Sequence, residues 1–258
     1  MDIVQAVILS IVEGATEFLP VSSTGHMILA SYMMKIHDQA FVKTFTIAIQ
    51  LGAIAAIVML YYRRFLQSRQ IYIKLGIAFI PTAIVGFLAY KTIKTYLFNP
   101  LGVSLALVAG GIVLIAIDKQ VVARESRYAA PEDISYKNAF FIGLIQCLSM
   151  IPGVSRAAAT IIGGVFNGLD KKQATEFSFL LAVPTMLAAT GYDLLKTDAV
   201  VGSAEIMLLA CGFIGAFLSA WVAVMLFVRF VQNHGFKVFG YYRIVIGIVF
   251  LLYLTMSG

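Results

Sequence analysis

Two short polar motifs interrupt an apolar chain, and both carry side chains suited to phosphoryl chemistry. The first, residues 13–26, reads EGATEFLPVSSTGH, and the second, residues 152–160, reads PGVSRAAAT. Phosphoryl transfer requires a nucleophile, a base, a proton donor for the leaving group and positive charge beside the phosphate oxygens. Together the motifs supply serine hydroxyls, carboxylates, an imidazole and a guanidinium, which favours a single phosphate site built from both.

The first motif contains a pair of carboxylates. Glu13 and Glu17 are spaced i, i+4, so on a helix they project from one face and can share a proton or a divalent cation such as Mg²⁺ or Ca²⁺. An ionisable group at the centre of a membrane helix costs about 2.5–3.5 kcal/mol on insertion scales, which favours a functional role. The alternative is a shallower segment in which both glutamates are solvated.

The same motif provides hydroxyls and an imidazole after a helix stop. Pro20 ends the first helical arm, and Ser22, Ser23 or Thr24 can cap the next one. A capped helix start offers free N–H groups and the positive end of a dipole, which attract anions. His26 falls in the first turn, within reach of a proton on a bound group. A packed histidine is the alternative, but the neighbouring acids and serines favour function.

The second motif adds a buried cation. Pro152 again stops a helix and Ser155 can cap the next. The guanidinium of Arg156 is a planar fork of donors that matches phosphate oxygens. Thr160 is one turn further along and shares its face. The alternative is an arginine neutralised by a carboxylate of the first motif, a pairing that could coexist with substrate binding.

Composition places the whole chain in a membrane. Of its 258 residues, 60% are apolar and 12% are charged, and the mean hydropathy is +0.92, which excludes an ordinary water-soluble surface. The net charge of +6 forms no basic stripe, so nucleic acid is not an expected partner. Cys147 and Cys211 lack partners at disulfide or zinc spacing. The start of the chain lacks a signal-peptide pattern, so we expect the N-terminus to be retained.

Six apolar stretches approach the roughly 20 residues that a membrane-spanning helix requires. They are Phe41–Tyr62, Ile71–Tyr90, Leu101–Ile117, Phe177–Leu195, Ile206–Val228 and Val238–Thr255. The third is short, so its helix is expected to extend into Asp118 or to lie in a thin part of the bilayer. We interpret all six as transmembrane helices.

Two further apolar segments are broken in the middle and contain the two polar motifs. Ile3–Tyr32 is interrupted at residues 19–25, and Tyr136–Phe166 is interrupted at residues 151–155. Each arm has about 11–16 residues, or roughly 17–24 Å, and falls short of a bilayer core of about 30 Å. We therefore expect two re-entrant helix-break-helix hairpins, residues 2–36 and 136–168, with their tips in protein or a wet cavity.

The order of these segments predicts one all-α polytopic membrane domain, residues 1–258, with an internal repeat. A hairpin and three spans form the first repeat, residues 1–117, and a hairpin and three spans form the second, residues 136–258. Because three is an odd number, the second hairpin enters from the opposite face. The result is an inverted-topology repeat whose broken tips can meet near the bilayer midplane.

The distribution of lysine and arginine predicts the orientation. One face collects Arg63, Arg64, Arg69, Lys74, Lys119, Arg124, Arg127, Lys137, Lys171, Lys172, Arg229 and Lys237, and the other collects Lys35, Lys43, Lys91, Lys94 and Lys196. The richer face is expected to be cytoplasmic. Both termini and the base of the first hairpin are then outside. Arg156 and Arg243 remain within the membrane and need partners.

At these residues the chain resembles the undecaprenyl-diphosphate phosphatase family associated with bacitracin resistance. The resemblance covers nearly the whole chain. Besides the first motif it rests on Lys43-Thr44-Phe45, Ile49-Gln50-Leu51-Gly52, Phe98-Asn99-Pro100, Gln146, Pro152-Gly153-Val154-Ser155-Arg156, Glu176 to Pro184 and Tyr242-Arg243. Where the family reads Ser-Arg-Ser-Gly-Ala-Thr, residues 155–160 here read SRAAAT, so no role is expected for the missing serine.

The resemblance implies hydrolysis of undecaprenyl diphosphate to undecaprenyl phosphate, the carrier used in peptidoglycan synthesis, at an outward-facing site in the bacterial inner membrane. The implied site residues are Glu13 and Glu17 as the acidic pair, Ser23 as the nucleophile with Ser22 beside it, His26 for proton transfer, and Arg156, Ser155 and Thr160 for phosphate binding. Attack by Ser23 and attack by a metal-bound water both remain open. The expected partners are the lipid substrate and membrane lipids, and a homodimer is compatible with the sequence.

Two other functions fit parts of the pattern. A phosphatase class with a nucleophilic histidine needs a further histidine after its Ser-Arg segment, and none occurs between Arg156 and His234. A transporter or flippase of a lipid phosphate is the stronger alternative, because inverted repeats with broken helices are typical of secondary carriers. A pure transporter has no evident need for serine, imidazole and paired carboxylates at one phosphate site, which favours the hydrolase.

Overall fold

Long apolar helices enclose four short ones in the computed structural model of the chain, which describes residues 1–67, 69–97, 99–196 and 202–257. The elements are α1 (Ile3–Glu17), α2 (Ser23–Met33), α3 (Ala40–Ala48), α4 (Gln50–Gln67), α5 (Arg69–Tyr96), α6 (Pro100–Val122), α7 (Tyr136–Gln146), α8 (Arg156–Phe166), α9 (Lys171–Leu195), α10 (Ser203–Asn233) and α11 (Lys237–Ser257), with 3-10 turns at Pro131–Asp133 and Cys147–Met150. No strand occurs in these ranges. The expected all-α class is confirmed.

Six helical segments are long and apolar enough to cross a membrane within the described ranges. They are Ala40–Gln67, Arg69–Ile93, Pro100–Val122, Lys171–Leu195, Ser203–Asn233 and Lys237–Met256. Each contains one of the six stretches expected from the sequence, so the prediction of a multi-pass membrane protein is confirmed. Phe98, which contributes to the family resemblance, lies outside the described residues.

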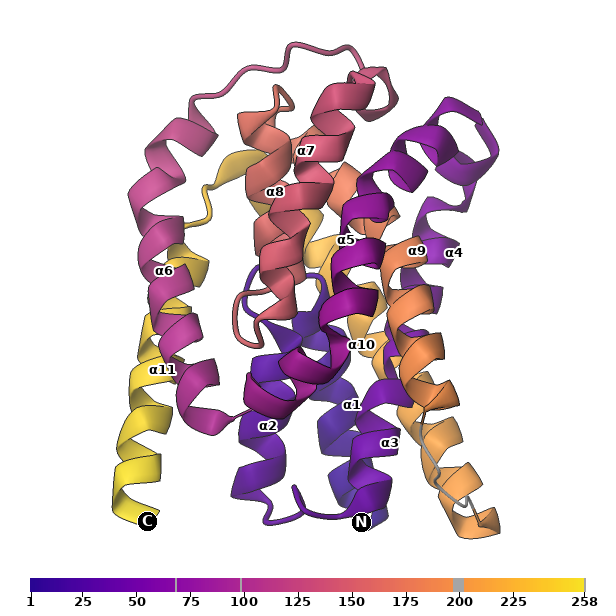
Figure 1. The fold of residues 1–258 in the computed structure, drawn as a ribbon, viewed down its shortest axis with the longest axis vertical. Helices are drawn as coiled ribbons and strands as arrows, with labels where there is room; N and C mark the ends of the chain where they lie inside the picture. Colours follow the sequence, from indigo (N-terminus) through magenta and orange to yellow (C-terminus); the bar gives the residue numbers. More distant parts are fainter. Residues whose placement is uncertain (68, 98, 197–201, 258) are drawn as a thin grey trace.

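The shortest expected span, Leu101–Ile117, corresponds to α6, which continues past Ile117 to Val122. This extension was expected because the apolar stretch alone is short for a membrane span. Its continuation has a structural reason, because Asp118 is buried and accepts hydrogen bonds from the backbone N–H groups of Phe236 and Lys237, at 2.5 and 2.9 Å. The carboxylate thereby satisfies donors at the start of α11 that have no partner within that helix. This contact joins α6 to α11, which pack along each other at one side of the molecule (Figure 1).

Four short helices carry the polar motifs and meet near the middle of the molecule. The pair α1 and α2 occupies the end where both chain termini lie, and the pair α7 and α8 occupies the opposite end (Figure 1). The observed breaks, residues 18–22 and 147–155, overlap the expected interruptions at 19–25 and 151–155. The segments that link each pair point toward each other, so both motifs lie at a similar depth (Figure 1).

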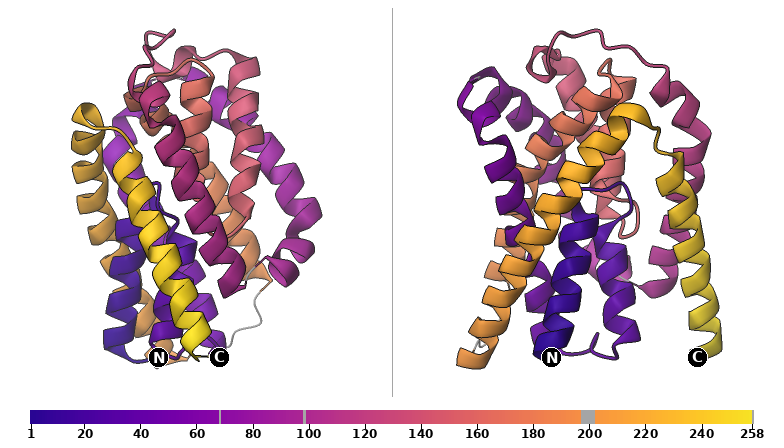
Figure 2. Two further views of the ribbon diagram at one scale, coloured as in Figure 1. Left: turned by 90° about the vertical axis from the view of Figure 1, so that its left-hand side faces the viewer. Right: turned by 180° about the vertical axis from the view of Figure 1, so that it is seen from behind.

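Close helix contacts hold these short elements in place. Helix α1 packs along α10, which runs obliquely across the molecule (Figure 2). Gly14 makes this approach possible, because a Cβ there would lie 2.4 Å from the carbonyl oxygen of Ala216. Gly143 serves the same purpose between α7 and α5, where a Cβ would lie 2.0 Å from the carbonyl oxygen of Ala78. The motifs are thus anchored on rigid neighbours.

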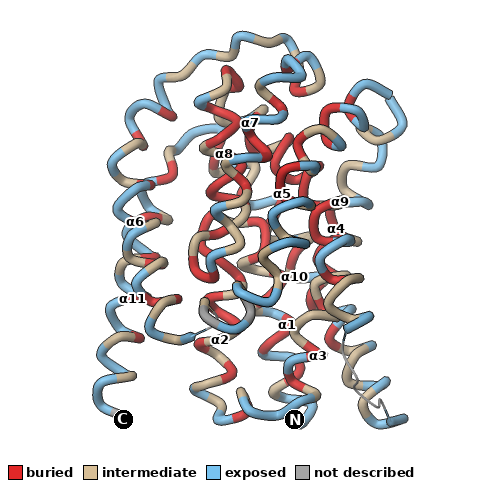
Figure 3. The backbone as a smooth tube through the Cα atoms, viewed as in Figure 1, coloured by how far each residue is buried: buried red, intermediate tan, exposed pale blue. Residues whose placement is uncertain are grey.

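Burial is concentrated in the centre of the molecule (Figure 3). The outward faces of the long helices instead expose large apolar side chains, such as Leu88 on α5 and Leu226 on α10. A soluble protein rarely exposes apolar surface on this scale, whereas lipid tails are a suitable solvent for it. The buried centre is therefore where polar chemistry can be protected.

One expected span is not a continuous helix. The stretch Phe41–Tyr62 is divided at Ile49 into α3 and α4. At this point the N–H of Gly52 bonds to the carbonyl of Ile49 at 3.0 Å, the tighter i+3 spacing of a 3-10 turn. Gly52 also packs against the backbone of Phe213, since a Cβ there would lie 2.3 Å from its carbonyl oxygen. Gln50 lies at this turn, facing the central cavity described below.

Candidate active site

The two broken segments contact each other directly. The hydroxyl of Ser155 lies 3.5 Å from the carbonyl oxygen of Leu19, which places the second break against the first. Arg243 of α11, fully buried, joins them more extensively through its guanidinium. Its acceptors are the carbonyl oxygens of Pro20, Ala106, Leu107, Gly153 and Val154, at 2.7–3.4 Å. Carbonyl groups freed by the breaks, together with two of α6, therefore supply the partners that Arg243 needed.

A serine in an unusual backbone conformation caps the helix after each break. Ser22 has φ 70° and caps α2, and Ser155 has φ 76° and caps α8. Their hydroxyls accept hydrogen bonds from the N–H groups of Gly25 and Ala158, at 3.4 and 3.2 Å. A positive φ is uncommon for a residue with a side chain, and such conformations cluster at functional sites. Ser22 and Ser155 thus cap the helices that follow the two breaks, and both were among the residues expected to do so.

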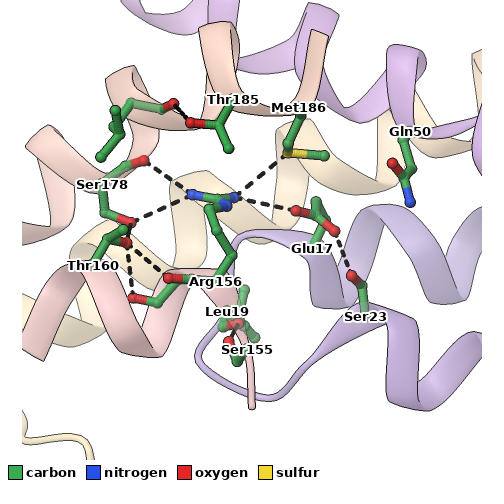
Figure 4. A network of polar contacts seen from close by, with 12 residues as sticks. Glu17, Leu19, Ser23, Gln50, Ser155, Arg156, Thr160, Ser178, Thr185 and Met186 are labelled. Carbon is green, nitrogen blue, oxygen red and sulfur yellow. Dashed lines mark hydrogen bonds and ion pairs between the residues drawn. The ribbon is translucent and has the colours of Figure 1, made fainter. Parts of the chain in front are cut away.

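Glu17 connects the nucleophile candidate to the arginine (Figure 4). One carboxylate oxygen lies 3.2 Å from Nη2 of Arg156, and the other accepts a short hydrogen bond from the hydroxyl of Ser23. The side chains of Glu17 and Arg156 are 8% and 10% exposed, so this ion pair is shielded from water. The structure thus brings Glu17, Ser23 and Arg156 together, and the alternative expected for the arginine, neutralisation by a carboxylate, occurs with Glu17.

The remaining contacts of Arg156 fix its orientation. Nη1 donates to the carbonyl oxygen of Ser178 at 3.0 Å, and the guanidinium carbon lies 5.4 Å from the centre of the Phe18 ring. Thr160 does not touch the guanidinium, but its hydroxyl lies 2.6 Å from the hydroxyl of Ser178 (Figure 4). Nε of Arg156 is buried and has no acceptor within the described part of the chain. One strong donor therefore remains available for an anion.

Glu13 lies one turn before Glu17 and has a different environment. It is fully buried, and neither carboxylate oxygen has a hydrogen-bond partner among the described residues. A buried carboxyl group without a partner requires either a proton or a cation. The same ranges contain no cluster of three or more histidine, cysteine or acidic side chains. The two glutamates are therefore the acidic ligands that the described site offers to a metal ion.

The imidazole of His26 is held at both nitrogens. Nδ1 lies 2.8 Å from the carbonyl oxygen of Ser22, and Nε2 lies 2.8 Å from the hydroxyl of Tyr242. A carbonyl oxygen can only accept, so Nδ1 carries the proton and Nε2 accepts from the tyrosine. His26 thus supports the strained backbone of Ser22 and connects it to α11.

A cavity of about 860 Å³ reaches this site. Glu17 and Arg156 line its inner part, and its outer part is lined by residues 37 and 38 and by the C-terminal ends of α5 and α9. These segments lie toward the end that carries both chain termini (Figure 1). Apolar residues such as Met27, Ile28 and Phe87 line much of the wall. An amphipathic ligand with an anionic end suits such a cavity.

Comparison with known proteins agrees with this combination of fold and site. Residues 6–249 match the model of the family described as bacitracin resistance protein BacA. The chain belongs to this family. A relative from Wolinella succinogenes is 49% identical over 99% of this chain and 100% of its own length, and one from Aquifex aeolicus is 48% identical over 95% of this chain and 96% of its own. Both are named undecaprenyl-diphosphatase.

Within this BacA-family site, four residues were not assigned a role from the sequence. Ser178 orients Arg156, Tyr242 holds His26, Arg243 joins the two breaks, and Gln50 lines the cavity. All four belong to segments that carried the family resemblance, and the requirement of Arg243 for partners was evident from its place in an apolar helix. Nothing in the sequence indicated which partners these residues contact, because each contact crosses between distant helices.

Proposed function

We propose that the chain is an undecaprenyl-diphosphatase that hydrolyses undecaprenyl diphosphate to undecaprenyl phosphate and inorganic phosphate. The observation that carries this proposal is the link from Ser23 through Glu17 to Arg156 at the inner end of an amphipathic cavity. Relatives named undecaprenyl-diphosphatase over their full length support it. The reaction regenerates the lipid carrier for peptidoglycan synthesis, and the family's description connects it with bacitracin resistance.

The contacts of Ser23 and Arg156 support a nucleophilic mechanism. The terminal phosphate binds Nε of Arg156, which has no other acceptor in the described site. Ser23 Oγ attacks the terminal phosphorus while its proton passes to the hydrogen-bonded Glu17, and the bond to the bridging oxygen breaks, releasing undecaprenyl phosphate. Water then hydrolyses the phosphoserine to inorganic phosphate and restores the serine. Arg156 stabilises negative charge on the phosphate oxygens throughout.

A divalent cation, Mg²⁺ or Ca²⁺, fits the acidic pair. The buried and unpaired carboxylate of Glu13, together with Glu17, would hold it. Such an ion supplies further positive charge for the phosphate oxygens when it is bound. Glu17 would then divide its two oxygens among the cation, Arg156 and Ser23.

Rapid quench can distinguish a serine nucleophile from an attacking water. Acid quench within a single turnover is expected to trap phosphate covalently on wild-type protein, at Ser23, and none on Ser23→Ala. Exchange of labelled oxygen from water into phosphate with no trapped phosphoserine would identify water as the nucleophile. Ser22→Ala is the matched control, because Ser22 is the neighbouring serine in the sequence and its hydroxyl caps helix α2.

For the finer topology we propose two re-entrant hairpins in an inverted repeat, residues 1–117 and 136–258. Paired serine caps with positive φ and entry from opposite ends support this arrangement. The positive-inside rule then puts both termini, and the mouth of the cavity, outside. A cysteine introduced at Gln67, between two spans on the opposite end, should resist a membrane-impermeant thiol reagent added outside. Labelling at this position would show that the protein has the opposite orientation in the membrane.

The first experiment is phosphate release by the purified protein in detergent, measured with and without EDTA. Wild type is compared with Glu17→Ala, Ser23→Ala and Arg156→Ala. We expect all three variants to lose activity while they retain the elution volume and thermal unfolding of a folded protein. A transporter of lipid phosphate is the alternative outcome. In that case the folded wild type would release no phosphate and would instead move unchanged lipid between the leaflets of a vesicle.

A further inference from the structure

The described site has little positive charge for a ligand with two phosphates. Arg156 is already neutralised by Glu17, whose carboxylate oxygen lies 3.2 Å from Nη2. A lipid diphosphate brings negative charge on the terminal phosphate and on the phosphate next to the lipid. The residues of the two motifs account for the first phosphate only. The second phosphate therefore requires donors elsewhere in the cavity.

One face of α3 and of the start of α4 provides such donors. Lys43, Thr46 and Gln50 all line the cavity, Lys43 and Thr46 from one face of α3 and Gln50 from the first residue of α4. Lys43 is exposed and has no ion-pair partner within the described residues. Within those residues it is the one lysine that lines the cavity. Its ammonium group is a free cation at the outer part of the wall.

Gln50 lines the same cavity as Lys43 and Thr46 and as the candidate active-site residues Glu17 and Arg156. Its side-chain oxygen accepts a hydrogen bond from the hydroxyl of Thr190 at 3.0 Å, which directs the amide nitrogen the other way. No hydrogen bond of that nitrogen occurs among the described atoms, and Gln50 lines the same cavity as Glu17, with both side chains drawn in Figure 4. The 3-10 turn at Ile49 holds the residue at this position. The three donors thus line the same cavity as Glu17 and Arg156.

We infer that Lys43, Thr46 and Gln50 form a second phosphate-binding subsite, which holds the lipid-linked phosphate while Arg156 holds the terminal one. This inference rests on the proposed function for its substrate. It predicts a preference for diphosphates over monophosphates, because a single phosphate occupies only one of the two subsites. The four-carbon stem of Lys43 lets its ammonium reach inward from the helix toward the amide of Gln50.

Binding of a non-hydrolysable diphosphate tests the subsite without catalysis. The probes are methylenediphosphonate and inorganic phosphate, each titrated by calorimetry into detergent-purified protein. Lys43→Met should weaken the diphosphonate by about tenfold or more, the loss of one charge-assisted contact, and leave phosphate affinity unchanged. Lys43→Arg should stay within about threefold of wild type, since it keeps the charge. Lys91→Met, which removes an exposed lysine outside the cavity lining, is the matched control.

Turnover gives the second readout. With undecaprenyl diphosphate, Lys43→Met should raise KM by about tenfold and change kcat by less than about threefold, because the contact is made equally before and during reaction. Equal effects of Lys43→Met and Lys91→Met, or an unchanged KM and diphosphonate affinity in a folded Lys43→Met protein, would overturn the subsite. If Lys43→Met selectively loses diphosphonate binding while wild type releases no phosphate, the subsite is sustained and the hydrolase function is rejected.

Discussion

The hydroxyl of Tyr242 lies 2.8 Å from Nε2 of His26, and the two rings are parallel within 1° with centres 5.5 Å apart. Since Nδ1 of His26 is bonded to the carbonyl of Ser22, the tyrosine fixes the remaining nitrogen and thereby the tautomer. The histidine is held between α2 and α11 in one orientation. Because Nε2 accepts from Tyr242, any proton exchange between Nε2 and a ligand would first have to break or pass through this hydrogen bond.

Removal of the tyrosine hydroxyl should therefore affect catalysis only through His26. Tyr242→Phe keeps the ring but loses the hydrogen bond, so we expect kcat for phosphate release to fall several-fold and the free energy of unfolding to fall by about 1 kcal/mol. In a His26→Ala background the same substitution should have almost no further effect on kcat, because the shared contact is already absent. Additive losses in the double variant would show that Tyr242 acts independently.

Arg156 should not tolerate replacement by lysine. Its guanidinium serves Glu17 and the carbonyl of Ser178 at the same time, and an ammonium group cannot span both. For Arg156→Lys we expect kcat/KM to fall by about 100-fold or more, measured as phosphate release at low substrate concentration. Arg64→Lys is the control, since Arg64 also pairs with a glutamate, Glu176, on the helix end away from the cavity. A loss of similar size there would indicate a general sensitivity of the fold to arginine replacement.

Local patterns in the sequence predicted most of what lies along each helix. The length and hydropathy of the six spans are local properties, and so are the breaks at Pro20 and Pro152 and the presence of serines able to cap after them. Such features depend on backbone preferences and on the thickness of the bilayer. They do not depend on which helix packs against which.

Contacts between distant helices could not be predicted in this way. Ser178 meets Arg156, and Tyr242 meets His26 across 216 residues, only because α9 and α11 pack beside the short helices. The turn at Ile49 was also missed, since the apolar pattern continues through it unchanged. Side-chain periodicity reports which face of a helix is buried, and it carries no information about the partner on that face.

We expect Arg243 to be required for the stability of the fold, and its removal to affect activity only through that loss of stability. Its guanidinium is the donor for five carbonyl oxygens from both breaks and from α6. Arg243→Met leaves the carbonyl oxygens in the breaks, those of Pro20, Gly153 and Val154, without this partner, at a cost on the order of 1 kcal/mol or more for each. We expect the variant to unfold at much lower temperature and to lose activity together with structure. Ser23→Ala gives the contrasting result, loss of phosphate release at unchanged unfolding temperature.

Glu13→Gln tests the cation through stability as well as activity. In EDTA the variant should be at least as stable as wild type, because an amide in this fully buried position avoids placing an unpaired carboxylate there. Added Mg²⁺ or Ca²⁺ should then raise the unfolding temperature of wild type more than that of the variant, since only the wild type retains both acidic ligands. Activity restored to EDTA-treated protein should require about tenfold or more cation in the variant. An equal rise in unfolding temperature for both proteins would place the cation elsewhere and leave Glu13 as a protonated, structural residue.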